Sequence, residues 1–157
     1  RSLLLDTSPE NPPDSITELL LYAADRAQHV NEIIRPSLNK GDWVISDRFC
    51  GSTLAYQGYG RKLDIKLIKD LETIATQGIS PDITFLLDIP VEESIKRRIS
   101  RSDDRIEKEG TDFLKNVSLG FQVLSEDNRW KKISALNSQE VIISEIKYEI
   151  KKLLNNK

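Results

Sequence analysis

The spacing of apolar residues along the chain predicts helices in several places. The first helix is expected from Ser15 to about Arg35, where Pro36 stops its continuation, and its apolar stripe consists of Ile16, Leu20, Ala23, Ala27, Val30 and Ile34. Four further helices are expected over 64–77, from Pro90, over 111 to about 127, and after Ser138.

Residues typical of helix ends support these boundaries. Ser15 and Glu18 fit a capping box, in which the hydroxyl and the carboxylate each satisfy a free backbone donor. Asp64 is expected to cap the second helix, and Gly78 is expected to close it in the left-handed conformation.

Three short apolar runs are expected to be buried strands, over 43–47, 83–89 and 130–136. At least one helix separates each run from the next. Strands that alternate with helices predict an α/β fold, in which helices flank a parallel sheet. The 157 residues suit a single domain over 1–157, although three strands make a small sheet for this class.

Composition excludes several classes of function. The net charge is −2, so no bulk positive field favours long nucleic acids. No apolar run approaches the roughly 18 residues of a membrane span, and no signal-peptide pattern opens the chain. The single cysteine forms no internal disulfide, which fits a reducing compartment such as the cytoplasm.

The start of the chain is unusual, because the sequence contains no methionine and opens on Arg1 to Asp6, which resembles the tail of a helix. N-terminal processing and a longer parent protein both explain this, and the second explanation is favoured. No Gly-x-x-x-x-Gly-Lys-Ser/Thr phosphate loop occurs. If the front is missing, such a loop would have been lost with it.

Asp47 and Arg48 lie at the end of the first of these apolar runs, where a strand of an open α/β sheet would deliver them to a ligand. An arginine there suits a phosphate, because its planar fork makes two charge-assisted bonds at once. Asp47 suits a metal or a proton. The alternative is a structural ion pair at the end of the sheet.

Two further groups of side chains suit a base and a sugar. Directly downstream of Arg48 lie Ser52, Thr53, Tyr56 and Gln57. The alternative for these polar residues is an ordinary surface loop without a binding role. Tyr22 and Arg26 are four residues apart on one helix face, where the ring suits stacking on a base and the guanidinium suits its carbonyl edge. The alternative is a surface packing pair. His29 and Cys50 are interpreted as structural residues.

Arginines recur every four residues at Arg97, Arg101 and Arg105. A solvated helix face is the ordinary interpretation of such a run. The alternative is a mobile lid over about 96–109, whose arginines close over a transferred phosphoryl group, since phosphoryl transfer needs positioning and cations rather than covalent help.

Four ordered motifs resemble those of thymidylate kinases, namely the runs 21–29 (Leu-Tyr-Ala-Ala-Asp-Arg-Ala-Gln-His), 47–49 (Asp-Arg-Phe), 52–58 (Ser-Thr-Leu-Ala-Tyr-Gln-Gly) and 104–107 (Asp-Arg-Ile-Glu). The run 81–88 also resembles their strand before the lid. The likeness covers essentially the whole chain, and an arginine in the lid favours the bacterial type.

The resemblance implies a three-layer P-loop kinase fold that lacks its N-terminal part, and transfer of the ATP γ-phosphoryl group to dTMP with Mg²⁺. It assigns stacking on thymine to Tyr22, where the family usually has phenylalanine, and bonding of the base carbonyl to Arg26. It assigns the acceptor phosphate to Arg48 and a position near magnesium, directly or through water, to Asp47. The remaining implied roles are base-pocket lining by Ser52 and Thr53, exclusion of a 2′-hydroxyl by Tyr56, framing of the base by Gln57, and charge stabilisation by Arg101 with Arg97 and Arg105 in support.

The family also implies a homodimer formed through the helices near 15–35, and the 157 residues alone are expected to show no turnover. Two alternatives stay open at this point. One is another deoxynucleotide kinase of the same architecture. The other is a non-catalytic nucleotide-binding or interaction module derived from a P-loop kinase.

Overall fold

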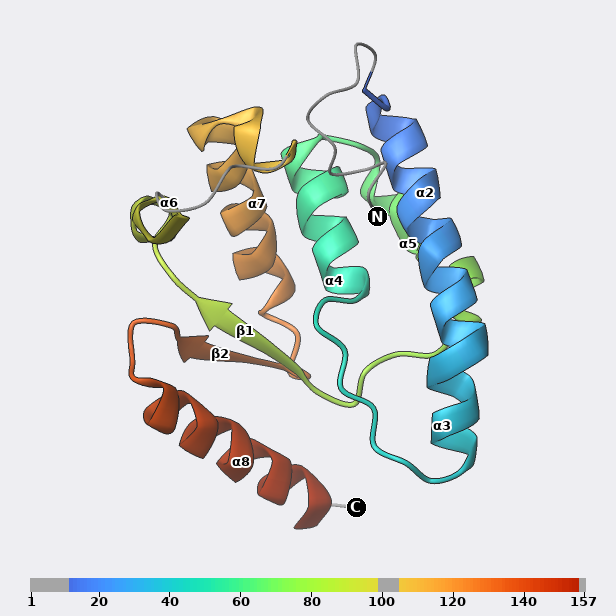
Figure 1. The fold of residues 1–157 in the computed structure, drawn as a ribbon, viewed down its shortest axis with the longest axis vertical. Helices are drawn as coiled ribbons and strands as arrows, with labels where there is room; N and C mark the ends of the chain where they lie inside the picture. Colours follow the sequence, from blue (N-terminus) through green and yellow to red (C-terminus); the bar gives the residue numbers. More distant parts are fainter. Residues whose placement is uncertain (1–11, 99–104, 156–157) are drawn as a thin grey trace.

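The computed structural model describes residues 12–98 and 105–155, so the expected helix tail at Arg1 to Asp6 lies outside the described residues. In chain order the elements are α2 (Ser15–His29), η1 (Val30–Ile34), α3 (Arg35–Asn39), α4 (Cys50–Thr53), η2 (Leu54–Gly60), α5 (Ile65–Thr76), β1 (Thr84–Asp88), α6 (Val91–Arg98), η3 (Glu107–Glu109), α7 (Thr111–Leu124), β2 (Trp130–Ser134) and α8 (Gln139–Asn155) (Figure 1).

The N-terminus of α2 is capped by Asp14, whose carboxylate accepts from the backbone N–H groups of Ile16 at 2.8 Å and Thr17 at 2.9 Å. The predicted capping box of Ser15 and Glu18 is therefore wrong. Asp14 already occupies the N-cap position, and this leaves the Glu18 side chain to turn into the protein, where it is fully buried.

The first helical region also continues past its predicted end at Arg35. A wider turn, η1, lets the Arg35 N–H bond to the Val30 carbonyl, and α3 then carries the helix to Asn39. Pro36 lies in the first turn of α3, where its missing N–H costs little.

The inward face of α2 differs from the predicted stripe at its N-terminal end. Ala23, Val30 and Ile34 are buried as expected, but Ile16 and Leu20 are exposed, and Leu19 is buried instead. The N-terminal part of the buried face therefore contains Leu19 in place of Leu20 and does not include Ile16.

The predicted strand over 43–47 does not form, which corrects the expectation that Asp47 and Arg48 end a buried strand. The segment has no regular secondary structure, and Trp43 and Ile45 are 65% and 93% exposed. A strand exists only where a neighbour takes its backbone hydrogen bonds, and β1 and β2 are the only paired strands in the described part of the chain.

Strands β1 and β2 pair in parallel, with Thr84 opposite Trp130 and Asp88 opposite Ser134. Both lie where the sequence predicts strands, over 83–89 and 130–136. In Figure 1, α8 lies on one side of this pair, and α7 and α4 lie on the other. The parallel pairing and the flanking helices confirm the α/β class.

Helices α5, α6, α7 and α8 confirm their predictions. Asp64 caps α5 by accepting from the Lys66 N–H at 2.8 Å. The left-handed turn that closes α5 begins one residue before the predicted glycine, because Gln77 and Gly78 both have positive φ, at 51° and 79°.

Residues 50–60 form a helix, α4 continued by η2, instead of a surface loop. It packs against α7, and Ala55, Ile106, Phe113 and Val117 form the buried core between them. The Tyr56 ring lies 6.2 Å from that of Phe113 and 6.1 Å from that of Phe121. This helix carries Ser52, Thr53, Tyr56 and Gln57, so its packing fixes their positions.

Across residues 12–98 and 105–155, no helix combines the length and the apolar character that crossing a lipid bilayer requires.

Candidate functional site

Arg26 on α2 connects four parts of the chain. Its Nη2 donates to the Thr53 hydroxyl at 2.7 Å, and its carbon Cζ lies 5.1 Å from the centre of the Phe49 ring. Its Nε lies 2.7 Å from a carboxylate oxygen of Glu72 on α5, an ion pair whose angles fall outside those of a hydrogen bond. The predicted base-binding arginine is thus oriented by α4 and α5 together.

Arg48 brings three of the other predicted residues together. Its guanidinium carbon lies 5.2 Å from the centre of the Tyr56 ring. Partial burial alone would lower the pKa of Arg48, but Tyr56, Asp47 and Tyr22 together outweigh this, and the pKa of Arg48 is raised. Arg48 therefore stays charged beside two phenols and a carboxylate.

The backbone of Arg48 is strained, with φ at 73° in the left-handed region that residues other than glycine seldom adopt. The Ser46 hydroxyl supports this turn by donating to the Arg48 carbonyl at 2.7 Å. Strain of this kind persists where the surroundings hold it, and it is concentrated at functional sites. This turn, and not the end of a strand, therefore places the Arg48 guanidinium beside the Tyr56 ring.

The helix of residues 50–60 presents its predicted site residues at different depths. Thr53 and Gln57 are buried, whereas Ser52 and Tyr56 are half-buried. The Gln57 amide donates to Glu18 at 2.7 Å. The side chains of Tyr22, Arg26, Arg48, Thr53 and Tyr56 therefore lie together as a candidate site between α2 and this helix, and Gln57 is buried next to it.

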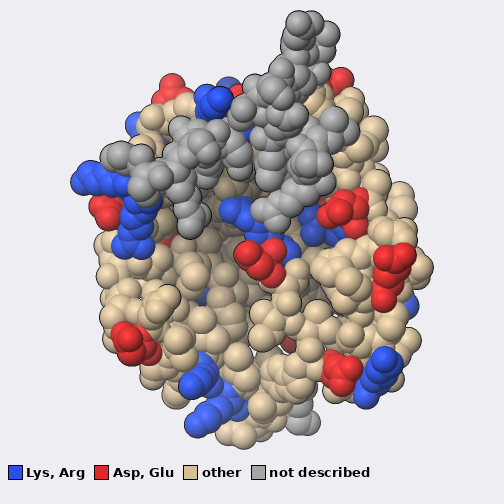
Figure 2. Space-filling model, in the orientation of Figure 1, with Lys and Arg blue, Asp and Glu red and all other residues tan. Residues whose placement is uncertain are grey.

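The predicted lid arginines do not gather at one point among the described residues. Arg97 donates to the carbonyl of Ala135, just after β2, at 3.0 Å. Arg105 donates to the buried carboxylate of Glu18. Arg101 lies outside the described residues. Figure 2 shows basic side chains beside acidic ones near the middle of the face viewed in Figure 1, next to a hollow.

Two carboxylates that the sequence did not identify as partners of the site arginines, Glu72 and Glu18, are central to this geometry. Glu72 lies on the inward face of α5, between Ile68 and Ala75, and is 4% exposed. An acid at helical spacing within an apolar stripe was the signal that could have identified it. Glu18 is fully buried, and its signal was hidden by the interpretation as a capping residue.

Cys50 behaves as the sequence predicts, as a packing residue. Burial first, and then the neighbouring Glu72 carboxylate, raise the pKa of the Cys50 thiol to about 12. The thiol is therefore protonated at neutral pH and is a poor nucleophile there.

No group of three or more His, Cys, Asp or Glu residues arranged to hold a metal ion occurs in the described ranges 12–98 and 105–155. Mg²⁺ at nucleotide sites is commonly held by one or two carboxylates together with substrate phosphates. Asp47 is exposed and adjoins Arg48, so a single carboxylate fits that pattern.

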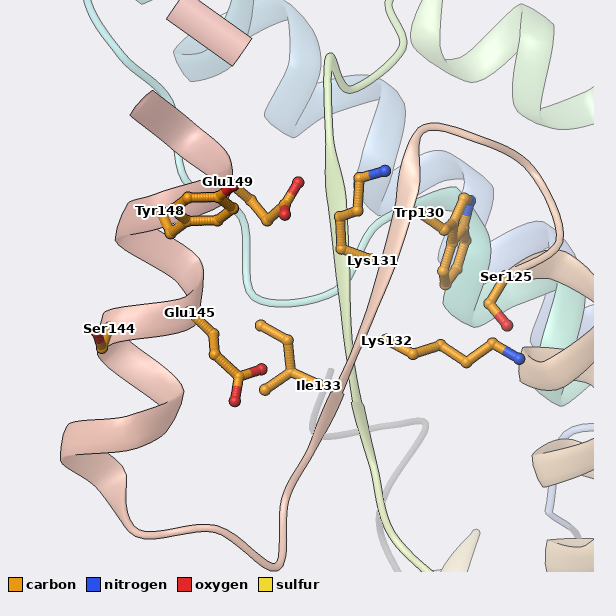
Figure 3. A pocket seen from close by; sticks show the side chains of 9 residues that line it. All are labelled: Ser125, Trp130, Lys131, Lys132, Ile133, Ser144, Glu145, Tyr148 and Glu149. Carbon is orange, nitrogen blue, oxygen red and sulfur yellow. The ribbon is translucent and has the colours of Figure 1, made fainter. Parts of the chain in front are cut away.

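An open cavity of about 600 Å³ lies between β2 and α8, away from the predicted site residues (Figure 3). It is lined by Ser125, Trp130, Lys131, Lys132, Ile133, Ser144, Glu145, Tyr148 and Glu149. None of the residues that surround Arg26 and Arg48 contributes to it.

Comparison with known proteins identifies the family of the chain. The family model described as thymidylate kinase matches residues 1–146. The thymidylate kinase of Prochlorococcus marinus strain NATL1A is 82% identical over 157 residues, which cover all of this chain and 74% of the relative. That of strain MIT 9313 is 54% identical over 151 residues, which cover 96% of this chain and 70% of the relative. Because the match spans nearly the whole chain, including both helices that form the site, this chain belongs to the thymidylate kinase family of phosphotransferases.

Proposed function

We propose that this chain binds dTMP and closes over it as part of an enzyme that transfers the γ-phosphoryl group of ATP to dTMP. The products are dTDP and ADP. The observation that carries this proposal is the convergence of Arg48, Tyr22 and Tyr56, with Arg26 and Thr53 adjoining, between two helices that are distant in the sequence.

Each side chain has a role that its chemistry supports. Arg48 holds the acceptor phosphate through charge-assisted bonds, and Tyr22 stacks on thymine. Arg26 donates to the base carbonyl. Glu72 and Thr53 orient its guanidinium, and the group has five N–H donors, so donors remain for the base. Tyr56 is rigidly packed on α7 and excludes a 2′-hydroxyl.

The remaining roles complete the acceptor pocket and the lid. Ser52, Thr53 and Gln57 line the base pocket. The lid spans about 96–109, with Arg101 stabilising charge on the transferring phosphoryl group and Arg97 and Arg105 supporting it. Asp47 would hold Mg²⁺ directly or through water, and the ion would neutralise charge on the phosphate oxygens. We propose a single kinase domain, a homodimer and a cytoplasmic location.

The first test is dTMP binding to the 157-residue chain by isothermal titration calorimetry. Arg48→Ala removes charge-assisted bonds to the phosphate, which are worth roughly 1.5–3 kcal/mol each, so binding should weaken at least about tenfold. Arg129→Ala is the matched control, because Arg129 is a surface arginine paired with Asp127. Equal weakening by both variants would contradict the role of Arg48.

Turnover is measured in a coupled ADP assay on this chain extended by the part of the 82% identical relative that the match leaves uncovered. The extended chain should phosphorylate dTMP and strongly prefer it to UMP and CMP. Equal rates on the three acceptors would overturn the substrate assignment. Nucleotide binding without turnover by the extended chain would instead support a non-catalytic module.

A further inference from the structure

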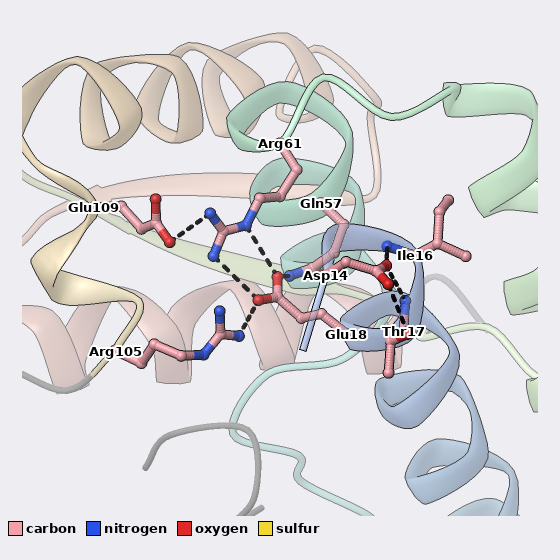
Figure 4. A network of polar contacts seen from close by, with 8 residues as sticks. All are labelled: Asp14, Ile16, Thr17, Glu18, Gln57, Arg61, Arg105 and Glu109. Carbon is pink, nitrogen blue, oxygen red and sulfur yellow. Dashed lines mark hydrogen bonds and ion pairs between the residues drawn. The ribbon is translucent and has the colours of Figure 1, made fainter. Parts of the chain in front are cut away.

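Glu18 joins two parts of the chain that the proposed function treats separately. Its carboxylate accepts from Gln57 Nε2 at 2.7 Å, on the helix that borders the acceptor site (Figure 4). The same carboxylate accepts from Arg105, the first described residue after the gap at 99–104 and thus near the C-terminal end of the proposed lid.

A third donor completes the surroundings of Glu18. Arg61 contacts the carboxylate through Nε at 3.3 Å and Nη2 at 3.1 Å, while its Nη1 lies 2.5 Å from Glu109. The two carboxylates and the two guanidiniums balance in charge. Figure 4 shows the four side chains converging from α2, from the residue after η2, from the segment before η3 and from η3 itself.

The charge on Glu18 is maintained despite its burial. Burial alone would raise its pKa, but the bonds from Arg61, Gln57 and Arg105 outweigh this, and the pKa of Glu18 is lowered. Because the ionised Glu18 carboxylate has no exposed surface, its charge is stabilised by its hydrogen-bond donors, and the carboxylate in turn fixes the positions of those donors. A movement of Arg105 therefore alters the hydrogen bond of Gln57, because both side chains donate to the Glu18 carboxylate.

We propose that Glu18 is a positioning residue that couples residues 105–110 to the acceptor site. This inference rests on the proposed function. Occupation of the acceptor site fixes Gln57 and so tightens the Glu18 carboxylate on Arg105, and ordering of residues 105–110 in turn orders the wall of the acceptor site. Coupling of this kind is reciprocal.

The test is hydrogen exchange of the 157-residue chain with and without dTMP. In the wild type, dTMP should slow exchange about fivefold or more in peptides covering 105–110, although the proposed ligand contacts lie elsewhere. Glu18→Gln should abolish this slowing while dTMP still protects residues 22–26. Glu109→Gln is the matched control, because Glu109 contacts Arg61 in the same cluster and should leave the slowing intact.

The outcomes separate the coupling from a purely structural role. Loss of fold would change exchange everywhere, whereas loss of coupling removes only the response of 105–110 to dTMP. If Glu18→Gln does not fold, Arg105→Lys supplies the same test, because it weakens one arm and leaves the Arg61 contacts in place. A wild type that binds dTMP with no response at 105–110, or a response that survives in the folded variant, would overturn the coupling. Failure to bind dTMP at all would contradict the proposed function instead.

Discussion

Glu72 and Cys50 show how one buried carboxylate sets the chemistry of its neighbours at the scale of single residues. The Glu72 carboxylate orients Arg26 and also raises the pKa of the Cys50 thiol, which burial has already raised. In an unfolded chain the pKa of this thiol would be about 8.5. Protonation of Cys50 therefore stabilises the fold fully below about pH 8.5, and this contribution is lost as the pH rises toward about 12.

Alkylation of Cys50 by iodoacetamide tests this assignment. At pH 8.5 the native thiol should react at least about tenfold more slowly than the thiol of the urea-unfolded chain, because less thiolate is present. Glu72→Gln should lower the pKa of Cys50 and speed the native reaction, and the exposed Glu126→Gln should not. A native rate that levels off near pH 9 would show that the thiol pKa is unshifted.

At the scale of elements, the site depends on close contact between α7 and the helix of residues 50–60. Gly120 on α7 permits that contact, because a Cβ there would lie 2.7 Å from a ring atom of Tyr59. Gly60, on the helix of residues 50–60, likewise permits the close approach of α7, since a Cβ at Gly60 would lie 2.6 Å from the ring of Phe113. This close approach lets Tyr56 pack against Phe113 and Phe121 of α7.

Gly120→Ala should therefore destabilise the protein, although alanine favours a helix by about 1 kcal/mol over glycine. Three atoms of Tyr59, two of them in its ring, lie within 2.9 Å of the added Cβ, and overpacking costs about 1–3 kcal/mol. Urea unfolding followed by circular dichroism measures the net loss. Leu119→Ala, on the exposed side of the same helix, is the control and should be close to neutral. A more stable Gly120→Ala variant would show that the helices separate easily.

Prediction from sequence succeeds at this scale wherever an element is defined by its own residues. Asp64 caps α5 and the run 83–89 pairs as a strand because both signals are local. The run 43–47 carries the same apolar signal and yet forms no strand, since pairing depends on a neighbour that its own residues do not specify. The helix of residues 50–60 was missed because its polar residues resemble a loop until their burial is known.

Over the whole molecule, the motifs selected side chains that lie near one another, namely Tyr22, Arg26, Arg48, Thr53 and Tyr56, and their role in binding the acceptor stays a prediction. What the sequence could not provide is how they are held. Glu18 reaches partners 39, 43 and 87 residues away, and such contacts follow from the packing of helices rather than from any local pattern. The lid arginines remain a prediction, with Arg101 outside the described residues.

The proposed homodimer is the last property that belongs to the whole molecule. Ile16 and Leu20 lie four residues apart on α2 and are 45% and 52% exposed, so they form an exposed apolar pair on this helix. The same patch on a second copy would cover it in a two-fold arrangement, which is the commonest symmetry of oligomers.

Light scattering after size exclusion should then give twice the chain mass of 17.9 kDa. Leu20→Glu places a charge at the centre of that contact and should give the monomer, because an unpaired buried charge is costly. Ile74→Glu on α5, where the side chain is 73% exposed, should leave the dimer intact. A monomeric wild type, or a dimer that tolerates Leu20→Glu, would place any association on another face.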